Sequence, residues 1–379
     1  MATFAIIAGG GTAGHVVPGL AIAQELVDRG VPAAAVHCVG SARGIETRLV
    51  PEAGFPLTVL PGRGIQRRLT LANVAAVLGL IGAVLKAIVL VGRHRPAVVV
   101  GLGGYASVPC VIAAVLWRVP IVVAEQNAVP GAANRLAGRF ARACAVSFDG
   151  TELPRSVWTG NPVRREVLAV ADPSDRERAA ARDRLGVEGD RTLVAVFGGS
   201  LGARRINHAV ADAVPAFSGR SDLALRHVSG RRDHAELIDR TAGHTDLAVQ
   251  YDLVEYEDDM PSVYAAADVV LCRAGASSVA ELTVTGVPSI LVPLPGAPGD
   301  HQTANARALV DRGAATLVVD AELDAERARA EIAALVDDAD RRRSMANAAR
   351  DLARPDAAAA VVDLIAEHAR RPLPEEASR

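Results

Sequence analysis

His15 stands at a position in this chain that suggests chemistry. It follows the glycine-rich residues 9–14, which lie between an apolar run at residues 4–8 and an apolar helical pattern at residues 16–26. Glycine lets backbone approach a ligand closely, and a helix start offers unpaired N–H groups that suit a diphosphate. An imidazole changes protonation near neutral pH, so His15 can serve as a general base there. The alternative is a tight turn with a packing histidine.

The same loop matches a dinucleotide-binding pattern. Gly9, Gly11 and Gly14 satisfy G-x-G-x-x-G, which suggests NAD or NADP. An enzyme of this kind places an acid after its second strand for the ribose, or an arginine for a 2′-phosphate. The chain has no acid there but has Arg43, so an NADP-dependent oxidoreductase stays open as one interpretation.

Further candidate loops follow later strands. Residues 101–107 are rich in glycine and open a helix, and Glu125 and Asn127 come directly after an apolar run. The carboxyl ends of the strands in an open parallel sheet lie at one edge, where ligands bind. We therefore expect these loops and the loop of His15 to face one crevice.

The second half of the chain opens much as the first does. Residues 198–204 repeat the glycine loop after a strand, and Glu281 lies one turn into a helix that follows the small residues 274–278. A carboxylate can accept hydrogen bonds from both hydroxyls of a ribose, although a first-turn glutamate also favours the helix dipole. Gln302, at the start of another helix, suits a sugar hydroxyl or a polar cap.

The elements that position these residues alternate short β-branched runs with helical stretches. This alternation predicts an α/β fold with doubly wound parallel sheets. A length of 379 residues predicts two domains. The predicted strands cover residues 3–8, 34–39, 57–60, 97–100, 121–124, 143–147, 192–197, 224–228, 247–251, 269–272, 289–292 and 316–319. Two similar halves, each with a glycine loop, predict a cleft between them and argue against a single-site dehydrogenase.

Composition narrows the class of protein. A net charge of −2 gives no reason to expect a nucleic-acid partner. Four cysteines stand far apart without a C-x-x-C pair, which predicts reduced, buried thiols in a cytoplasmic protein. Because the chain enters a strand at once, we expect no secretory signal.

The most apolar predicted helix covers residues 69–92. Its length approaches that of a membrane span, but Lys86 lies within it and a strand follows immediately, so we expect a core helix with an apolar outer face. Arginines stand near both ends, at positions 67, 68, 93 and 95. They would attract anionic headgroups, so docking on a membrane surface and full burial remain alternatives.

The ordered set of motifs resembles the MurG family of N-acetylglucosaminyltransferases. No single motif carries this resemblance, which depends on seven motifs in the right order over nearly the whole chain. The motifs are residues 10–15, 103–105, 125–127, 160–164, 198–203, 273–281 and 301–306.

The resemblance implies a GT-B glycosyltransferase, in which two Rossmann-like domains face a cleft. Residues 1–163 would form the domain that faces the acceptor and the membrane, with a helix at residues 355–370 returning to it. Residues 164–353 would bind UDP-N-acetylglucosamine. The acceptor would be undecaprenyl-diphospho-N-acetylmuramoyl-pentapeptide, and the enzyme would be peripheral at the cytoplasmic face of the cell membrane.

The resemblance also assigns roles to matching residues. In the second domain, Glu281 would hold the ribose and Gln302 the sugar, while Glu257 would stand by the uracil. The other donor contacts would come from Thr12, Ala13, Gly14, Asn127, Arg164, Ser200, Ala276, Ser277, Ser278 and Val279, and the acceptor contacts from Gly103, Gly104 and Tyr105. Two positions depart from the family: Ala13 replaces a glycine, which requires a negative φ, and Glu257 replaces an isoleucine.

The implied reaction is an inverting displacement through an oxocarbenium-like state. We expect His15 to deprotonate the attacking C4 hydroxyl, with Glu125 as a weaker candidate for the base or as an orienting group. Helix N-termini and Arg164 would meet the charge of the leaving UDP. The sequence has no Asp-x-Asp motif suited to a phosphate-bound cation, so we expect neither a metal nor a cofactor.

Three alternatives remain open. Within the same class, a GT-B enzyme could glycosylate another lipid. From other classes, the chain could be the NADP-dependent oxidoreductase or a non-catalytic scaffold that binds a sugar nucleotide. The oxidoreductase leaves Glu281 and the second glycine loop unexplained.

Overall fold

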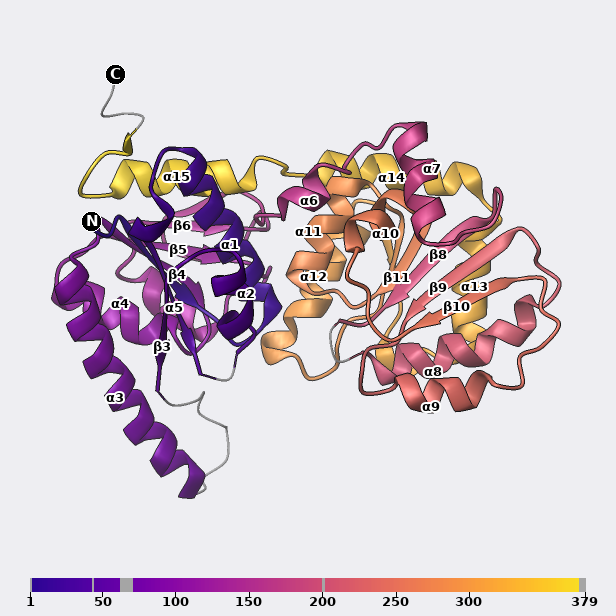
Figure 1. Cartoon of the computed structure of the whole chain (residues 1–379), viewed down its shortest axis with the longest axis horizontal. Helices are drawn as coiled ribbons and strands as arrows, with labels where there is room; N and C mark the ends of the chain where they lie inside the picture. Colours follow the sequence, from indigo (N-terminus) through magenta and orange to yellow (C-terminus); the bar gives the residue numbers. More distant parts are fainter. Residues whose placement is uncertain (1, 43, 62–70, 200–201, 375–379) are drawn as a thin grey trace. The chain divides into compact units, whose positions relative to one another are not determined.

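The chain folds into two compact α/β units (Figure 1). A computed structural model describes residues 2–42, 44–61, 71–199 and 202–374. The first unit comprises Met1–Arg164 with Arg354–Arg379, and the second comprises Arg165–Ala353. Each unit is built on one parallel sheet, which confirms the predicted α/β class.

The sheet of the first unit has seven parallel strands in the order β3-β2-β1-β4-β5-β6-β7. They are β1 (Ala5–Gly9), β2 (Val36–Ser41), β3 (Leu57–Leu60), β4 (Val98–Gly103), β5 (Ile121–Glu125), β6 (Ala143–Val146) and β7 (Ser156–Trp158). The strand order reverses between β1 and β4, and such a switch point opens a crevice at the carboxyl ends of the strands.

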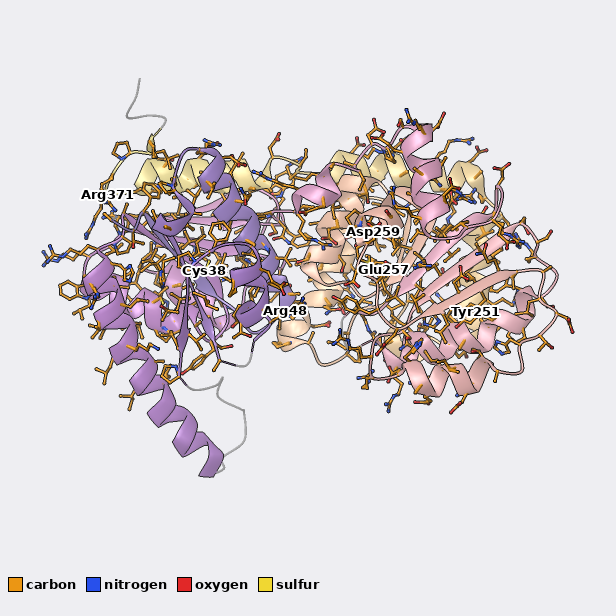
Figure 2. All side chains as sticks on the ribbon, in the orientation of Figure 1. Cys38, Arg48, Tyr251, Glu257, Asp259 and Arg371 are labelled. Atoms are coloured by element: carbon orange, nitrogen blue, oxygen red, sulfur yellow. The ribbon has the colours of Figure 1, made fainter. Side chains whose placement is uncertain are left out.

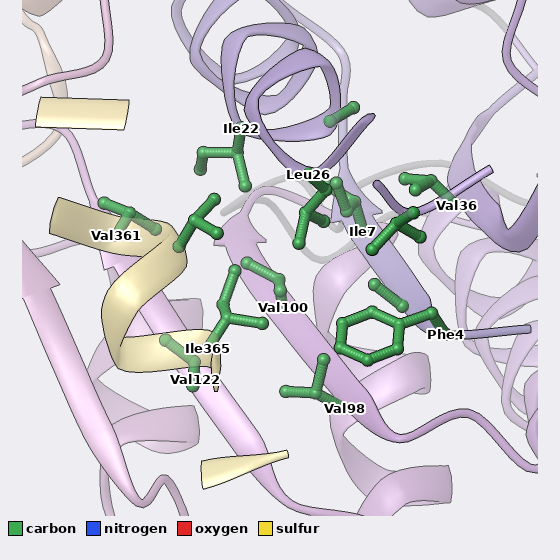
Figure 3. Close-up of a cluster of buried hydrophobic side chains, with 14 of the residues drawn as sticks. Phe4, Ile7, Ile22, Leu26, Val36, Val98, Val100, Val122, Val361 and Ile365 are labelled. Atoms are coloured by element: carbon green, nitrogen blue, oxygen red, sulfur yellow. The ribbon is translucent and has the colours of Figure 1, made fainter. Parts of the chain in front are cut away.

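Helices cover both faces of this sheet because its strands are buried on both sides. The helices are α1 (Ala13–Asp28), α2 (Glu46–Glu52), α3 (Leu71–His94), α4 (Ser107–Leu116), α5 (Ala132–Gly138) and α15 (Ala357–His368). On one face, Ile7 packs with Ile22 of α1 and Ile365 of α15 (Figure 3). Its neighbour Ile6 points to the other face and joins the core that includes buried residues of α3 and α4. The last helix therefore completes the core of the first unit.

The second unit has six parallel strands in the order β10-β9-β8-β11-β12-β13. They are β8 (Thr192–Phe197), β9 (Leu223–Val228), β10 (Gln250–Val254), β11 (Val269–Cys272), β12 (Ser289–Leu291) and β13 (Ala315–Leu317). The helices are α6 (Arg165–Leu168), α7 (Asp175–Arg184), α8 (Arg204–Ala213), α9 (His234–Thr241), α10 (Met260–Ala266), α11 (Ala276–Thr285), α12 (His301–Val310), α13 (Ala325–Val336) and α14 (Ala339–Leu352). The strand order reverses between β8 and β11, which repeats the plan of the first unit.

The structure corrects three predicted elements. The strand β7 was not predicted, because its three residues are all exposed at the sheet edge and show no buried pattern. The strand predicted at residues 247–251 is β10, which begins three residues later, at Gln250. The amide of Ala248 donates to the carbonyl of Ser218 instead of pairing with a neighbouring strand of the sheet. The first helix starts at Ala13 rather than at residue 16, which makes His15 a helical residue.

The predicted apolar helix is α3, which ends at His94. Among the described residues, no helix has both the length and the apolar character that crossing a membrane requires. Arg67 and Arg68 lie outside the described residues. All four cysteines are buried and unpaired, as predicted.

A buried histidine makes the stability of the second unit depend on pH. His227 of β9 is fully buried between the hydroxyl of Tyr251, at 3.0 Å, and Oδ1 of Asn207, at 3.1 Å. Burial, with a smaller contribution from the charge of His234, lowers the pKa of His227 to about 3. The unfolded chain, whose histidines titrate near pH 6.5, therefore binds a proton that the folded unit does not bind.

We expect the free energy of unfolding to fall as the pH drops from 6.5 toward 3, by up to about 1.4 kcal/mol per pH unit from this residue. Urea unfolding at pH 7.5 and pH 5, followed in the wild type and in His227→Gln, measures the effect. The variant should be less stable at pH 7.5 and should lose less stability on acidification. An equal loss in both proteins would contradict the assignment.

Candidate active site

The first cluster of candidate residues lies at the switch point of the first unit. Thr12 is the N-cap of α1, and its hydroxyl lies 3.2 Å from Nδ1 of His15, the third residue of the helix. The other ring nitrogen, Nε2, is 3.2 Å from the point that a Cβ on Gly103 would occupy. The imidazole therefore lies over the end of β4, with Nδ1 toward Thr12 and Nε2 toward Gly103.

The glycines that follow β4 allow this close approach. Gly103 and Gly104 have φ values of +96° and +72°, a region that side-chain-bearing residues rarely adopt. A Cβ on Gly104 would also lie 2.7 Å from the carbonyl oxygen of Gly10. The next residue, Tyr105, donates its hydroxyl proton to the carbonyl of Pro61 at 2.7 Å. The backbone thus passes directly beneath the imidazole.

Glu125 is a buried carboxylate at the end of β5. Its Oε1 accepts a hydrogen bond from the amide of Asn127 at 2.9 Å. Its Oε2 accepts from the amide of Gly131 at 3.0 Å and from Nδ2 of Asn134 at 2.9 Å. A carboxylate whose two oxygens are both occupied in this way is better suited to orient its neighbours than to take a proton. The geometry therefore favours the orienting role over the role of base.

Asn134 connects Glu125 to the position of His15. Its Nδ2 lies 3.2 Å from the point that a Cβ on Gly103 would occupy, and Nε2 of His15 lies at the same distance from that point. Asn134 was not among the predicted site residues, although it lies in the first turn of α5 after a proline-glycine pair. The only signal was its position a few residues after Glu125 and Asn127.

Three further predicted residues lie in the first unit. Ala13 begins α1 and is not among the residues with positive φ, so its methyl group is accommodated. Gly14 follows it in the first helical turn. Arg164 is half-buried and ends the first stretch of the first unit.

Glu281 lies in α11, the helix that follows β11 in the second unit. Its side chain is buried in α11, and its Oε2 accepts a hydrogen bond from the hydroxyl of Tyr264 at 2.8 Å. Tyr264 belongs to α10, which packs against α11. Sequence reasoning missed Tyr264, because nothing in its local pattern indicates a contact with a residue 17 positions later.

The start of α11 presents groups suited to a ligand. The helix begins at Ala276 after the N-cap Gly275, and no side chain caps it, so its first amides are not bound by a capping group. The Oγ of Ser277 is buried and has no hydrogen-bond partner among the described residues. Ser278 and Val279 complete this first turn. Unsatisfied polar groups at a helix N-terminus are the pattern expected for an anion or a nucleotide.

The loop after β12 brings Gln302 into α12. Oε1 of Gln302 accepts a hydrogen bond from the amide of Leu294 at 2.9 Å, so the amide nitrogen is the group turned to other partners. Three residues later, Asn305 is buried and donates to the carbonyl of Ala274 at 3.1 Å. The start of α12 is thereby tied to the loop before α11.

Glu257 follows β10, at the position labelled in Figure 2, and its carboxylate pairs with a residue of a neighbouring strand. Oε2 pairs with the guanidinium of Arg226 at 2.7 Å, and Oε1 accepts from the amide of Asp259 at 3.0 Å. The side chain is only 8% exposed. Arg226 therefore neutralises the charge of Glu257. A contact with a ligand at this position would be made by the backbone.

The glycine loop of the second unit ends at α8. Gly202 has a φ of +76°, and a Cβ there would lie 2.0 Å from the carbonyl oxygen of Ser229, so this position requires glycine. The helix starts after the N-cap Ala203 without a side-chain cap. Ser200 and Arg43 lie outside the described residues.

Comparison with known proteins decides the family. The sequence models for the glycosyltransferase family 28 N-terminal and C-terminal domains match residues 5–146 and 193–361. A "UDP-N-acetylglucosamine--N-acetylmuramyl-(pentapeptide) pyrophosphoryl-undecaprenol N-acetylglucosamine transferase" from Alkalilimnicola ehrlichii is 42% identical, over 96% of this chain and 99% of the relative. A relative of the same name from Desulforudis audaxviator is 40% identical, over 95% and 97% of the two chains.

A solved structure agrees with these relatives. The crystal structure of Acinetobacter baumannii MurG matches with a TM-score of 0.75 and 28% identity, over 96% of this chain and 99% of that one. The chain belongs to the MurG family of glycosyltransferases. The MurG-family resemblance and the GT-B class are thus confirmed, and membership of a transferase family weighs against the oxidoreductase and the non-catalytic scaffold.

Proposed function

We propose that the chain transfers N-acetylglucosamine from UDP-N-acetylglucosamine to the C4 hydroxyl of undecaprenyl-diphospho-N-acetylmuramoyl-pentapeptide. The product is the disaccharide lipid used in peptidoglycan synthesis, with a β-1,4 linkage. The observation that carries this proposal is the near full-length similarity to relatives that bear this activity in their names. The site geometry of both units supports it.

The donor is held mainly by the second unit, Arg165–Ala353. Glu281 accepts hydrogen bonds from the ribose hydroxyls, with Tyr264 holding one of its oxygens in place. The diphosphate and the nucleoside bind at the starts of α8 and α11, which no side chain caps, and at the buried hydroxyl of Ser277. Gln302 binds the sugar. Ser200, Arg164 and the backbone near Glu257 complete the set.

The acceptor is held by the first domain, residues 1–163 with α15. The backbone of Gly103 and Gly104 and the side chain of Tyr105 line its site. Nε2 of His15 takes the proton of the C4 hydroxyl as its oxygen attacks the anomeric carbon and the bond to UDP breaks. Glu125 orients Asn127 and Asn134 around this position. We also assign Thr12, Ala13, Gly14 and Asn127 of this domain to donor binding.

The test is incubation with labelled UDP-N-acetylglucosamine and the muramoyl-pentapeptide lipid in detergent. Label should enter the lipid fraction and depend on both substrates. Transfer to a different undecaprenyl-linked or glycerol-based lipid, with none to the muramoyl lipid, would favour the other GT-B alternative. Binding of the donor with no transfer to any lipid would favour the scaffold.

We further propose that the first unit docks on the cytoplasmic face of the cell membrane. Ile81, Leu85 and Val89 recur every four residues along α3, and each is more than half exposed. The exposed Leu116 and Trp117 end α4, which packs against α3. Exposed apolar surface of this kind marks an interaction site, and Lys86, Arg93 and Arg118 nearby would favour anionic lipids.

Substitution of the exposed apolar residues of α3 should weaken membrane binding. Leu85→Glu with Val89→Glu removes apolar area and adds negative charge, so we expect at least about tenfold weaker partitioning onto vesicles that contain anionic lipid. Co-sedimentation measures it. The control is Ile238→Glu, which places one negative charge on an exposed apolar residue of the second unit. Equal partitioning of both variants would contradict docking through α3.

A further inference from the structure

Glu46 is a buried carboxylate that the reaction described above does not use. It begins α2, and only 1% of its surface is exposed. The amide of Gly11, in the glycine loop before His15, donates to both of its oxygens, at 3.0 and 3.2 Å. Oε1 also accepts from the amide of Ser41 at 2.6 Å and from the hydroxyl of Ser41 at 2.9 Å.

Three glycines make room for this side chain. A Cβ on Gly10 would lie 2.2 Å from Oε1, and one on Gly44 would lie 1.9 Å from Oε2. A Cβ on Gly40 would lie 2.3 Å from Cγ of Glu46. These distances are shorter than any real contact between atoms. Any larger residue at these three positions would therefore collide with the side chain of Glu46.

The carboxylate is ionised at neutral pH. Burial alone would raise the pKa of Glu46, but hydrogen bonds from the backbone of Gly11 and Ser41 outweigh burial and bring its pKa below the usual range. A glycine loop before a helix is the place where dinucleotide-binding proteins accept a phosphate. In this chain the amide of Gly11 is already bound to an anion that belongs to the protein itself.

We propose that Glu46 is a positioning residue: its carboxylate occupies an anion position of the first glycine loop and fixes the entry into α1, and thereby the place of His15. The inference rests on the proposed function, in which His15 is the base. It also explains why a loop with the G-x-G-x-x-G pattern need not bind a dinucleotide. Glu46 acts on the reaction only through the loop.

The test compares three variants of the full chain in the lipid transfer assay. In Glu46→Gln, the amide nitrogen replaces an acceptor, so the loop shifts; we expect kcat to fall on the order of a hundredfold, with the KM for UDP-N-acetylglucosamine within about twofold of wild type. Glu46→Ala leaves a space that matches acetate. Added acetate should therefore raise the kcat of this variant at least about tenfold, whereas chloride at equal ionic strength should not. The matched control Glu52→Gln makes the same change at an exposed position of α2 and should behave as wild type.

The outcomes separate this inference from the proposed function. If the wild type and Glu52→Gln transfer no sugar, the proposed function fails. If they do and Glu46→Gln keeps a kcat near wild type, the positioning role is wrong. Failure of acetate to restore a folded Glu46→Ala that still binds UDP overturns the anion role. Loss of folding in both Glu46 variants, seen by thermal unfolding, would assign Glu46 to stability and likewise overturn the inference.

Discussion

Replacing His15 by alanine is expected to lower kcat for sugar transfer by about 10²–10⁴-fold, the usual contribution of a general base. The imidazole has Nδ1 beside the hydroxyl of Thr12 and Nε2 beside Gly103, in the loop proposed to hold the acceptor, so we assign the proton transfer to Nε2. Steady-state kinetics with the lipid acceptor measures the loss. UDP binding, followed by isothermal titration calorimetry, should remain, because the nucleotide contacts proposed above belong mainly to the second unit.

The matched control is His208→Ala, which removes a half-buried histidine that pairs with Glu236 in the second unit. Its kcat should stay within about twofold of wild type, because surface pairs contribute little. Activity of His15→Ala near that of the control would remove His15 as the base and leave Glu125 as the next group to test.

Replacing Glu281 by alanine is expected to raise the KM for UDP-N-acetylglucosamine by about 10- to 100-fold, with a much smaller change in kcat. Hydrogen bonds to a charged group contribute about 1.5–3 kcal/mol each, and the ribose contact is made in the ground state and the transition state alike. Kinetics over a range of donor concentrations separates the two parameters.

Tyr264→Phe provides the comparison for Glu281. It removes the hydroxyl that donates to Oε2 at 2.8 Å but keeps the ring and the carboxylate. We expect its KM to rise only a few-fold, in line with loss of one hydrogen bond. An unchanged KM in a folded Glu281→Ala would show that the ribose is held elsewhere.

Local sequence patterns predicted every strand of the two sheets except β7. Glycine loops after buried apolar runs placed His15 and Glu281 near the carboxyl ends of strands, because strand, turn and helix start follow one another within a few residues. The boundaries were harder to predict: α1 starts at Ala13, three residues earlier than expected. A three-residue edge strand such as β7 leaves no periodic signal at all.

The partners of the candidate residues could not be predicted in the same way. Gly11 and Glu46 are 35 positions apart, and Glu281 and Tyr264 are 17 apart, so these hydrogen bonds depend on how the strands and helices assemble. The ion pair of Glu257 with Arg226 likewise joins β9 to the loop after β10. Single-sequence patterns show which residues follow a strand, but not which side chains then meet.

The proposed reaction is a single displacement, in which the acceptor hydroxyl attacks the anomeric carbon as UDP leaves. The anomeric configuration of the new linkage in the lipid product, determined by NMR of the released disaccharide, reports on this step. A single displacement predicts a β-1,4 linkage from the α-linked donor. An α linkage would require two displacements or attack from the other face, and would contradict the role given to His15.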